Sequence, residues 1–272
     1  MKIPFTKMHG LGNDFILIDC RRETPDDLPA LSKKLCDRRF GIGADQMLLL
    51  YESESADFRM RILNADGGEV EMCGNGIRCL AKYIWDRGLS HNAVLSIETP
   101  AGIMRPGKAG DMIRVDMGEP VFDGRRIPVN LDGVIKDLPL KIGDKEFKIT
   151  CVSMGNPHAV AVVDGLDGFE VKKYGPLIET HPLFPRRINV EFIEILDPAH
   201  IKMRVWERGS GETMACGTGA SAAAVACSLK GLTGKKVKVA LLGGELMIEW
   251  EEDNHVYMTG PAVEVFEGLV NL

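Results

Sequence analysis

The chain has 272 residues, of which 45% are hydrophobic and 26% charged, as in an average globular protein, and its formal net charge is −6. No block of Lys or Arg stands out, which argues against a protein that binds nucleic acid or a membrane surface. The N-terminal stretch "MKIPFTKMHGLGNDF" lacks the apolar core of a signal peptide, and no apolar run reaches the ~18 residues of a membrane-spanning helix, so we expect a cytoplasmic protein.

The predicted elements of the first part of the chain follow a simple order. A Gly-Asn turn ending at Asn13 leads into the apolar strand "FILID". A second strand, "FRMRILN", carries apolar residues at every other position. A Gly-rich turn with Cys73 comes next, and a helix-like run then ends near Gly88, a residue suited to a helix C-terminus. Short strands follow.

The second part of the chain repeats this order. A Gly-Asn turn ending at Asn156 leads into "AVAVVD", and the strand "IKMRVWE" precedes a Gly-rich turn with Cys216. An Ala-rich helical run then ends near Gly231, and short strands resume. Its small side chains lie on every face, which suits a helix enclosed by a sheet.

A single offset of 143 residues superimposes the two parts without a gap. It aligns "FRMRILNADGGEVEMCGNG" with "IKMRVWERGSGETMACGTG", so that Cys73 coincides with Cys216. The same offset aligns Asn13 with Asn156. Because one offset serves well-separated stretches, chance is a poor explanation, and we infer two homologous halves.

We therefore expect an α+β fold of two pseudo-symmetric halves. Each half should be a curled sheet or partial barrel around one notable central helix, with the active site in the cleft between the halves. The first half should span residues 1–118 and the second residues 119–262, with residues 263–272 packing back onto the first half.

The seven cysteines do not form a disulfide or zinc pattern. Their number is odd, their spacing is scattered, no Cys-x-x-Cys pair occurs, and no histidines cluster near them. Five of them are therefore expected to be small buried apolar residues. These five are Cys20, Cys36, Cys79, Cys151 and Cys227.

The other two cysteines each stand before a glycine-rich helix start, in "CGNG" and "CGTG". Such a position places the sulfur at the positive end of a helix dipole, so we expect a lowered pKa for both thiols. The backbone amides there suit an anion such as a carboxylate. Two thiols on opposite sides of one carbon suit stereoinversion, in which one removes a proton and the other returns one. The alternative is that both turns are only structural helix entries.

Several long motifs, in order along nearly the whole chain, resemble those of the diaminopimelate epimerase family. They are "MHGLGNDF", "GIGADQ", "MCGNGIRC", "SMGNPHAV", "RRINVEF", "RVWERGSGETMACGTGASA" and "GGEL". The resemblance implies an isomerase that interconverts LL- and meso-diaminopimelate without pyridoxal phosphate, metal or other cofactor, on the route to lysine and peptidoglycan. It also implies a homodimer, with Cys73 and Cys216 as the two catalytic cysteines.

The resemblance assigns further site residues one at a time. Supporting roles near the reacting amine fall to His158 and Glu207. The substrate contacts that it implies are Asn13, Gln46, Asn64, Gly74, Asn75, Asn156, Asn189, Glu207, Arg208, Gly217 and Thr218. Among these, Arg208 would hold the far carboxylate of the substrate in a bidentate manner, and backbone amides at the two helix starts would hold the reacting carboxylate.

Other functions predict different behaviour. "GIGAD" lacks the full dinucleotide fingerprint, so NAD binding is not expected. A proline racemase-like enzyme would share the two cysteines, but that family usually has His after Cys-Gly, where this chain has Asn75. A two-cysteine redox sensor would not need Arg208, and a non-catalytic amino-acid binding protein would tolerate loss of both cysteines.

Overall fold

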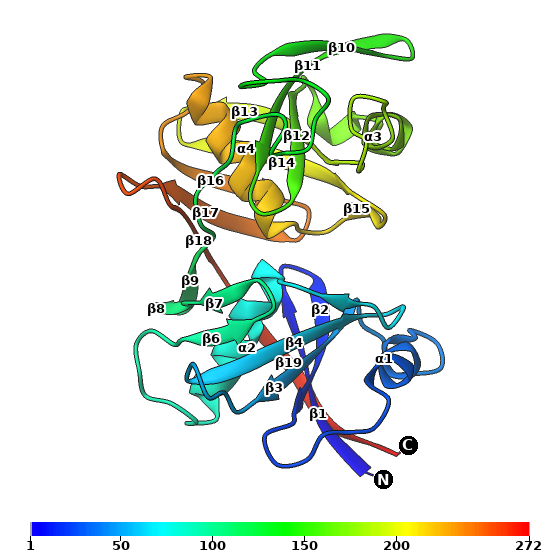
Figure 1. Cartoon of the computed structure of the whole chain (residues 1–272), viewed down its shortest axis with the longest axis vertical. Helices are drawn as coiled ribbons and strands as arrows, with labels where there is room; N and C mark the ends of the chain where they lie inside the picture. The colour runs from blue at the N-terminus through cyan, green and yellow to red at the C-terminus, as the bar shows by residue number, and fades with distance from the viewer. Residues whose placement is uncertain (1, 272) are drawn as a thin grey trace. The chain divides into compact units, whose positions relative to one another are not determined.

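The computed structural model describes residues 2–271, and the chain divides into two compact units. One unit comprises Met1–Val115 together with Thr259–Leu272, and the other comprises Asp116–Met258. Figure 1 shows that each unit combines a sheet with helices. No helix within residues 2–271 is both long and apolar enough to cross a membrane.

The first unit is built on a sheet with the strand order β19-β1-β2-β3-β4-β6-β7, in which β5 pairs with β4. Pairing is antiparallel except for β2 with β3 and β4 with β6. Its elements are β1 (Lys2–Gly10), β2 (Asn13–Asp19), α1 (Leu28–Cys36), β3 (Gln46–Tyr51), β4 (Phe58–Asn64), β5 (Glu69–Val70), α2 (Gly74–Asp86), β6 (Ile97–Thr99), β7 (Gly102–Met104), the hairpin of β8 (Gly107–Ala109) and β9 (Met112–Asp116), and β19 (Val263–Asn271).

The second unit repeats this plan with the strand order β10-β11-β12-β13-β14-β16-β17-β18, in which β15 pairs with β14. As in the first unit, the third and fifth neighbouring pairs of the series are parallel, β12 with β13 and β14 with β16. Its elements are β10 (Leu138–Ile142), β11 (Lys145–Ser153), β12 (Pro157–Val162), the short 3-10 helix η1 (Leu166–Gly168), α3 (Val171–Glu179), β13 (Asn189–Asp197), β14 (His200–Glu207), β15 (Gly211–Thr213), α4 (Gly217–Leu229), β16 (Lys236–Leu241), β17 (Gly244–Trp250) and β18 (Val256–Gly260).

The predicted central helices are α2 and α4, and the 143-residue offset relates them residue for residue. Helix α2 packs against β1, β2, β3, β4 and β19, whereas α4 packs against β11 to β14, β16 and β17. The Ala-rich residues of α4 are buried on every side, as expected for a helix enclosed by its sheet. Gly88 and Gly231 follow the two helices with φ angles of 63° and 72°, a left-handed conformation that favours glycine and ends a helix. The α+β class with two pseudo-symmetric halves is confirmed.

The expectation of one notable helix per half was wrong, because each unit has a second one. Helix α1 follows Asp27, whose side chain accepts a hydrogen bond from the amide of Ala30 at 3.1 Å, as in an N-cap. Helix α3 is less visible in the sequence because it contains Gly175 and Pro176. Gly175 is required for packing, since a Cβ there would lie 2.6 Å from the Trp206 ring. Each second helix covers the sheet face opposite the central helix with apolar side chains.

The edge strand that pairs with β1 in the first unit and the one that pairs with β11 in the second come from different parts of the chain. In the first unit, β19 runs antiparallel to β1, with partners from Lys2–Asn271 to His9–Val263. In the second unit, β10 comes immediately before β11 and forms a hairpin with it. The C-terminal strand thus completes the sheet in which the chain began.

Candidate active site

The predicted site residues of the first unit lie where strand and helix ends meet. Asn13 begins β2, Gln46 begins β3, Asn64 ends β4, and Cys73 precedes α2. Because β3 is parallel to β2 and antiparallel to β4, these strand ends share one edge of the sheet. The amide nitrogen of Gln46 donates to the side-chain oxygen of Asn64 at 2.8 Å, whereas the buried Oε1 of Gln46 has no hydrogen-bond partner among the described residues.

The second unit places the equivalent residues in the same way. Asn156 precedes β12, Asn189 begins β13, Glu207 ends β14, and Cys216 precedes α4. Asn189 accepts a hydrogen bond from the backbone amide of Arg208 at 2.7 Å and donates its own amide to the carbonyl oxygen of Pro157. The sequence repeat therefore corresponds to a repeated site geometry.

Each of the two cysteines is the N-cap of a 13-residue helix. The sulfur of Cys73 accepts a hydrogen bond from the amide of Gly76 at 3.4 Å, and that of Cys216 accepts one from the amide of Gly219 at the same distance. The first helical turns contain the other predicted contacts at these positions, which are Gly74, Asn75, Gly217 and Thr218. Both sulfurs thus lie at the positive end of a helix dipole.

The expected lowering of the Cys216 pKa was wrong. Burial raises the pKa of this thiol well above its ordinary value, and the carboxylates of Glu207 and Glu191 raise it further. Hydrogen bonds from Thr218 and Gly219 oppose this rise without overcoming it. Because only 6% of Cys216 is exposed, loss of hydration outweighs the effect of the helix end and favours the protonated thiol over the thiolate.

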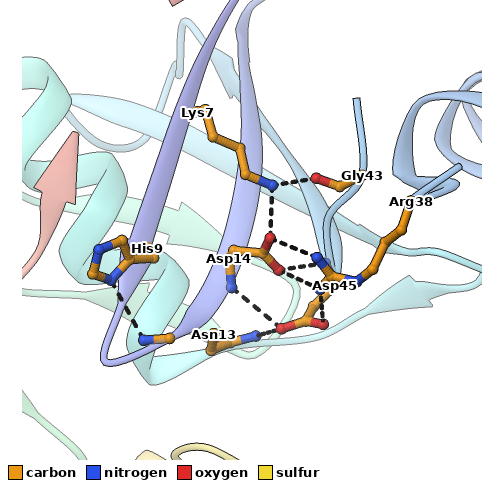
Figure 2. Close-up of polar contacts among 8 residues, drawn as sticks. Lys7, His9, Asn13, Asp14, Arg38, Gly43 and Asp45 are labelled. Carbon is orange, nitrogen blue, oxygen red and sulfur yellow. Dashed lines mark hydrogen bonds and ion pairs between the residues drawn. The ribbon is translucent and has the colours of Figure 1, made fainter. Parts of the chain in front are cut away.

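A charged network that the sequence reasoning missed surrounds Asn13 (Figure 2). Asp14 accepts hydrogen bonds from Lys7 at 2.7 Å and from Arg38 at 2.7 and 3.0 Å, and Arg38 also binds Asp45 at 2.7 Å. Burial alone would raise the pKa of Asp14, but Arg38 and Lys7 lower it to about 2. The Asp45 carboxylate in turn accepts the side-chain amide of Asn13 at 2.9 Å.

The second unit has a buried pair near its cysteine, formed by the predicted His158 and by Glu191, which was missed from the sequence. His158 and Glu191 have fully buried side chains, and the His158 Nδ1 lies 2.7 Å from the Glu191 Oε1. The His158 Nε2 lies 2.8 Å from the side-chain oxygen of Asn156, which donates its amide to the Thr218 hydroxyl. That hydroxyl lies 3.4 Å from the sulfur of Cys216, so a continuous polar chain joins the pair to the cysteine.

A signal for these residues was present in the repeat itself. The 143-residue offset places His158 on Phe15 and Glu191 on Leu48, so a hydrogen-bonded polar pair replaces an apolar one at equivalent sites. Both Phe15 and Leu48 are fully buried. A carboxylate at the position of a buried leucine indicates a role other than packing.

Arg208 has the freedom that a ligand-binding arginine needs. Its side chain is exposed, and its one hydrogen bond to a described residue goes to the backbone oxygen of Arg186 at 3.2 Å. The neighbouring Glu207 accepts a hydrogen bond from the Thr213 hydroxyl, which orients the carboxylate next to the Cys216 turn. These two residues are therefore not the mutual surface ion pair that their adjacency would allow.

Comparison with known proteins identifies close relatives over the whole chain. A family model described as diaminopimelate epimerase matches residues 5–122 and 150–265. The diaminopimelate epimerase of Pelotomaculum thermopropionicum is 56% identical over 97% of this chain and 97% of its own. That of Acetivibrio thermocellus is 55% identical over 98% of each chain, and that of Methanococcus maripaludis is 49% identical over 99% of this chain and all of its own.

Solved structures of more distant proteins have the same fold. A phenazine biosynthesis protein of the PhzF family from Bacillus anthracis aligns over both complete chains with a TM-score of 0.75 and 20% identity. A probable proline racemase from Agrobacterium radiobacter aligns over 99% of this chain and 92% of its own, with a TM-score of 0.72 and 17% identity. At such low identity the likeness concerns the fold alone.

Proposed function

The chain belongs to the diaminopimelate epimerase family, and from that premise we propose that it interconverts LL- and meso-diaminopimelate by a two-thiol mechanism. The observation that carries the mechanism is the repeated N-cap cysteine, Cys73 before α2 and Cys216 before α4. The reaction places the enzyme in the synthesis of lysine. The relatives do not favour the alternatives of a proline racemase or a redox sensor.

In the proposed reaction the two sulfurs act on opposite faces of one α-carbon. A thiolate at one cysteine removes the α-proton, and the thiol of the other cysteine delivers a proton to the opposite face. The C–H bond on one face breaks as a C–H bond on the other face forms, and the two cysteines exchange protonation states. The reverse reaction exchanges their roles, so the pair titrates as a coupled unit.

The weak acidity of the α-proton is the main obstacle, and the two helix N-termini address it. Negative charge grows on the substrate carboxylate as the proton leaves, and the amides at Gly74–Asn75 and Gly217–Thr218 stabilise that charge. The buried surroundings of Cys216 raise its pKa and therefore make its thiolate a stronger base than that of an ordinary cysteine.

The remaining residues select the substrate. The unpartnered Oε1 of Gln46 is a ready acceptor for an ammonium group, and the side-chain oxygens of Asn64 and Asn156 add further acceptors. The exposed guanidinium of Arg208 is suited to a bidentate grip on the carboxylate at the far end of the molecule. We also propose a cytoplasmic homodimer that works without a cofactor, on the strength of the family resemblance.

The proposal is tested by incubating the reduced protein with LL-diaminopimelate in D2O and following the α-proton by NMR. We expect deuterium at the α-carbon together with the meso isomer, and loss of inversion by at least about a hundredfold in Cys73→Ala and in Cys216→Ala. Cys227→Ala, a buried cysteine of α4 outside the site, is the control and should remain active. Absence of exchange and inversion in the unmodified protein would refute the proposal.

A further inference from the structure

Asn13, one of the predicted substrate contacts, is held by hydrogen bonds at both ends of its side-chain amide. Its nitrogen donates to the Oδ2 of Asp45 at 2.9 Å, as Figure 2 shows. Its oxygen accepts from the side-chain nitrogen of Asn75 at 3.1 Å and from the sulfur of Cys73 at 3.7 Å. The Asn13 amide therefore joins a carboxylate to the reacting thiol.

Asn13 and Asn75 belong to a series of hydrogen-bonded side chains, and the groups at its two ends allow only one orientation of these two amides. At one end stands the Asp45 carboxylate, bound to Arg38 at 2.7 Å, and an ionised carboxylate only accepts hydrogen bonds. At the other end the buried guanidinium of Arg78, which only donates, binds the side-chain oxygen of Asn75 at 2.9 Å. The direction Arg78–Asn75–Asn13–Asp45 follows, and each amide oxygen faces the arginine side.

The orientation of the Asn13 amide affects the protonation of Cys73. The side-chain oxygen of Asn13 faces the sulfur, so a thiol at Cys73 has an acceptor for its S–H. An amide turned the other way would present its nitrogen instead and would stabilise the thiolate. The orientation of one asparagine thus bears on which protonation state of Cys73 is favoured.

The second unit orients its asparagine in the opposite sense and with other groups. The equivalent Asn156 turns its nitrogen toward Thr218, the residue beside Cys216, and its oxygen toward His158. The 143-residue offset places Ile188 at the position of Asp45 and Ser221 at the position of Arg78, so neither end of the directed chain exists there. The directed series of hydrogen bonds from Arg78 to Asp45 therefore acts only on Cys73 and has no counterpart at Cys216.

We propose that Asp45 is a positioning residue for the reaction, one that fixes the Asn13 amide with its oxygen toward the Cys73 sulfur. The inference rests on the proposed function for its catalytic meaning, but the orientation itself has a separate readout. Asp45 is suited to substitution because its side chain is exposed, and Arg38 keeps two hydrogen bonds to Asp14 without it.

The test measures alkylation of each cysteine by iodoacetamide with mass spectrometry, alongside steady-state inversion of LL-diaminopimelate. Asp45→Ala should raise alkylation of Cys73 relative to Cys216 by about tenfold, because the thiolate is the nucleophile and the change removes both the amide anchor and a negative charge. It should also lower kcat/KM by roughly tenfold. Asp45→Glu, which keeps an acceptor-only group, should restore the alkylation ratio to within about threefold of the unmodified protein.

Two controls separate positioning from folding. Asp57→Ala removes another exposed carboxylate of the same unit, one that binds the Ser96 amide and hydroxyl, and should leave the ratio unchanged. The buried Cys20 and Cys151 should resist alkylation in every variant and would report unfolding if they did not. An unchanged ratio in Asp45→Ala would overturn the inference. A changed ratio in a protein that inverts no diaminopimelate would refute the proposed function alone and leave the positioning role standing.

Discussion

The two units share a backbone plan residue for residue over their helices but differ in how they hold charge near the cysteine. The 143-residue offset relates α1 to α3 and α2 to α4. The first unit uses partly exposed ion pairs around Asp14 and Asp45, with the apolar Phe15 and Leu48 beneath the helix start. The second unit instead buries the His158–Glu191 pair at those apolar positions, the equivalents of Phe15 and Leu48.

The first unit has the same fold with Phe15 and Leu48 at the equivalent positions, which indicates that the fold does not require the His158–Glu191 pair. A buried ion pair is often no more stabilising than apolar residues of similar volume, and the first unit contains that apolar alternative at the same sites. Burial raises the pKa of the Glu191 carboxyl, against the opposing effect of His158, so a negative charge on this carboxyl is costly. The geometry instead supports a role of the pair at Cys216. The hydrogen bonds that start at His158 pass through Asn156 and Thr218 and end at the Cys216 sulfur.

The largest effect should come from breaking that pair. His158→Phe leaves a buried carboxyl without its partner and should lower the free energy of unfolding by about 3–5 kcal/mol. The double variant His158→Phe/Glu191→Leu, which copies the first unit, should come within about 1 kcal/mol of the unmodified protein yet lose inversion by about a hundredfold. Urea unfolding and the inversion assay measure both quantities. A double variant as unstable as the single one would show that the fold does need the pair.

A second comparison uses one ion pair that both units possess. Arg204 binds Glu212 at 2.6 Å, both side chains are less than 20% exposed, and Arg204 also donates to the carbonyl oxygens of Leu166 and Phe169. The equivalent pair Arg61–Glu69 is more exposed.

Arg204→Gln should therefore cost about 2–3 kcal/mol of unfolding free energy, because it leaves buried acceptors unpaired, whereas Arg61→Gln should cost less than about 1 kcal/mol. Chemical denaturation of the two variants under one set of conditions provides the measurement. Equal costs would contradict the idea that burial separates the two pairs.

The third comparison concerns the glycine in the first turn of each central helix. A Cβ at Gly219 would lie 2.8 Å from the Glu191 Oε1 and 3.3 Å from the Cys216 sulfur, whereas one at Gly76 would meet the end of the Leu48 side chain at 3.1 Å. Gly219→Ala should cost about 2 kcal/mol and lower kcat, since two buried groups must move. Gly76→Ala should stay within about 1 kcal/mol of the unmodified protein, since alanine favours the helix. Thermal unfolding compares them, and a larger loss at Gly76 would refute this reading.

The smallest expected effect concerns Asp14, whose contribution to stability should be lost in acid. Arg38 and Lys7 lower the pKa of Asp14 to about 2 against the effect of burial, so the folded state favours its charged form. That stabilisation, about 1–2 kcal/mol, is fully present above the unfolded value near 3.9 and is lost as the pH falls toward 2. The second unit has Pro157 at the equivalent position, and a proline side chain makes no pH-dependent contribution to stability.

Asp14→Asn should accordingly be less stable than the unmodified protein at pH 6, and the difference should shrink between pH 4 and pH 2. Calorimetric midpoints at several pH values test this, because titration of the other carboxyls is common to both proteins. A constant difference across that range would contradict the lowered pKa.

Sequence patterns alone were enough to recognise the repeat, the family, the central helices and the two N-cap cysteines. These features are local or periodic, since an N-cap cysteine, a Gly-rich turn and an alternating strand can all be recognised from neighbouring residues. The second helix of each unit was less accessible. Gly175 and Pro176 disguise α3, and the reason for that glycine is the distant Trp206 ring.

The electrostatics of the site could not be predicted from the sequence, because they depend on how the chain folds. The helix-end argument predicted a low pKa for Cys216, but folding surrounds this sulfur with buried groups and places Glu191, from β13, close to it. Likewise Arg78 and Asp45 lie 33 residues apart in the chain, and only the fold brings them to opposite ends of one amide chain. Desolvation and hydrogen-bond direction depend on every neighbour in space, whereas sequence patterns report neighbours along the chain.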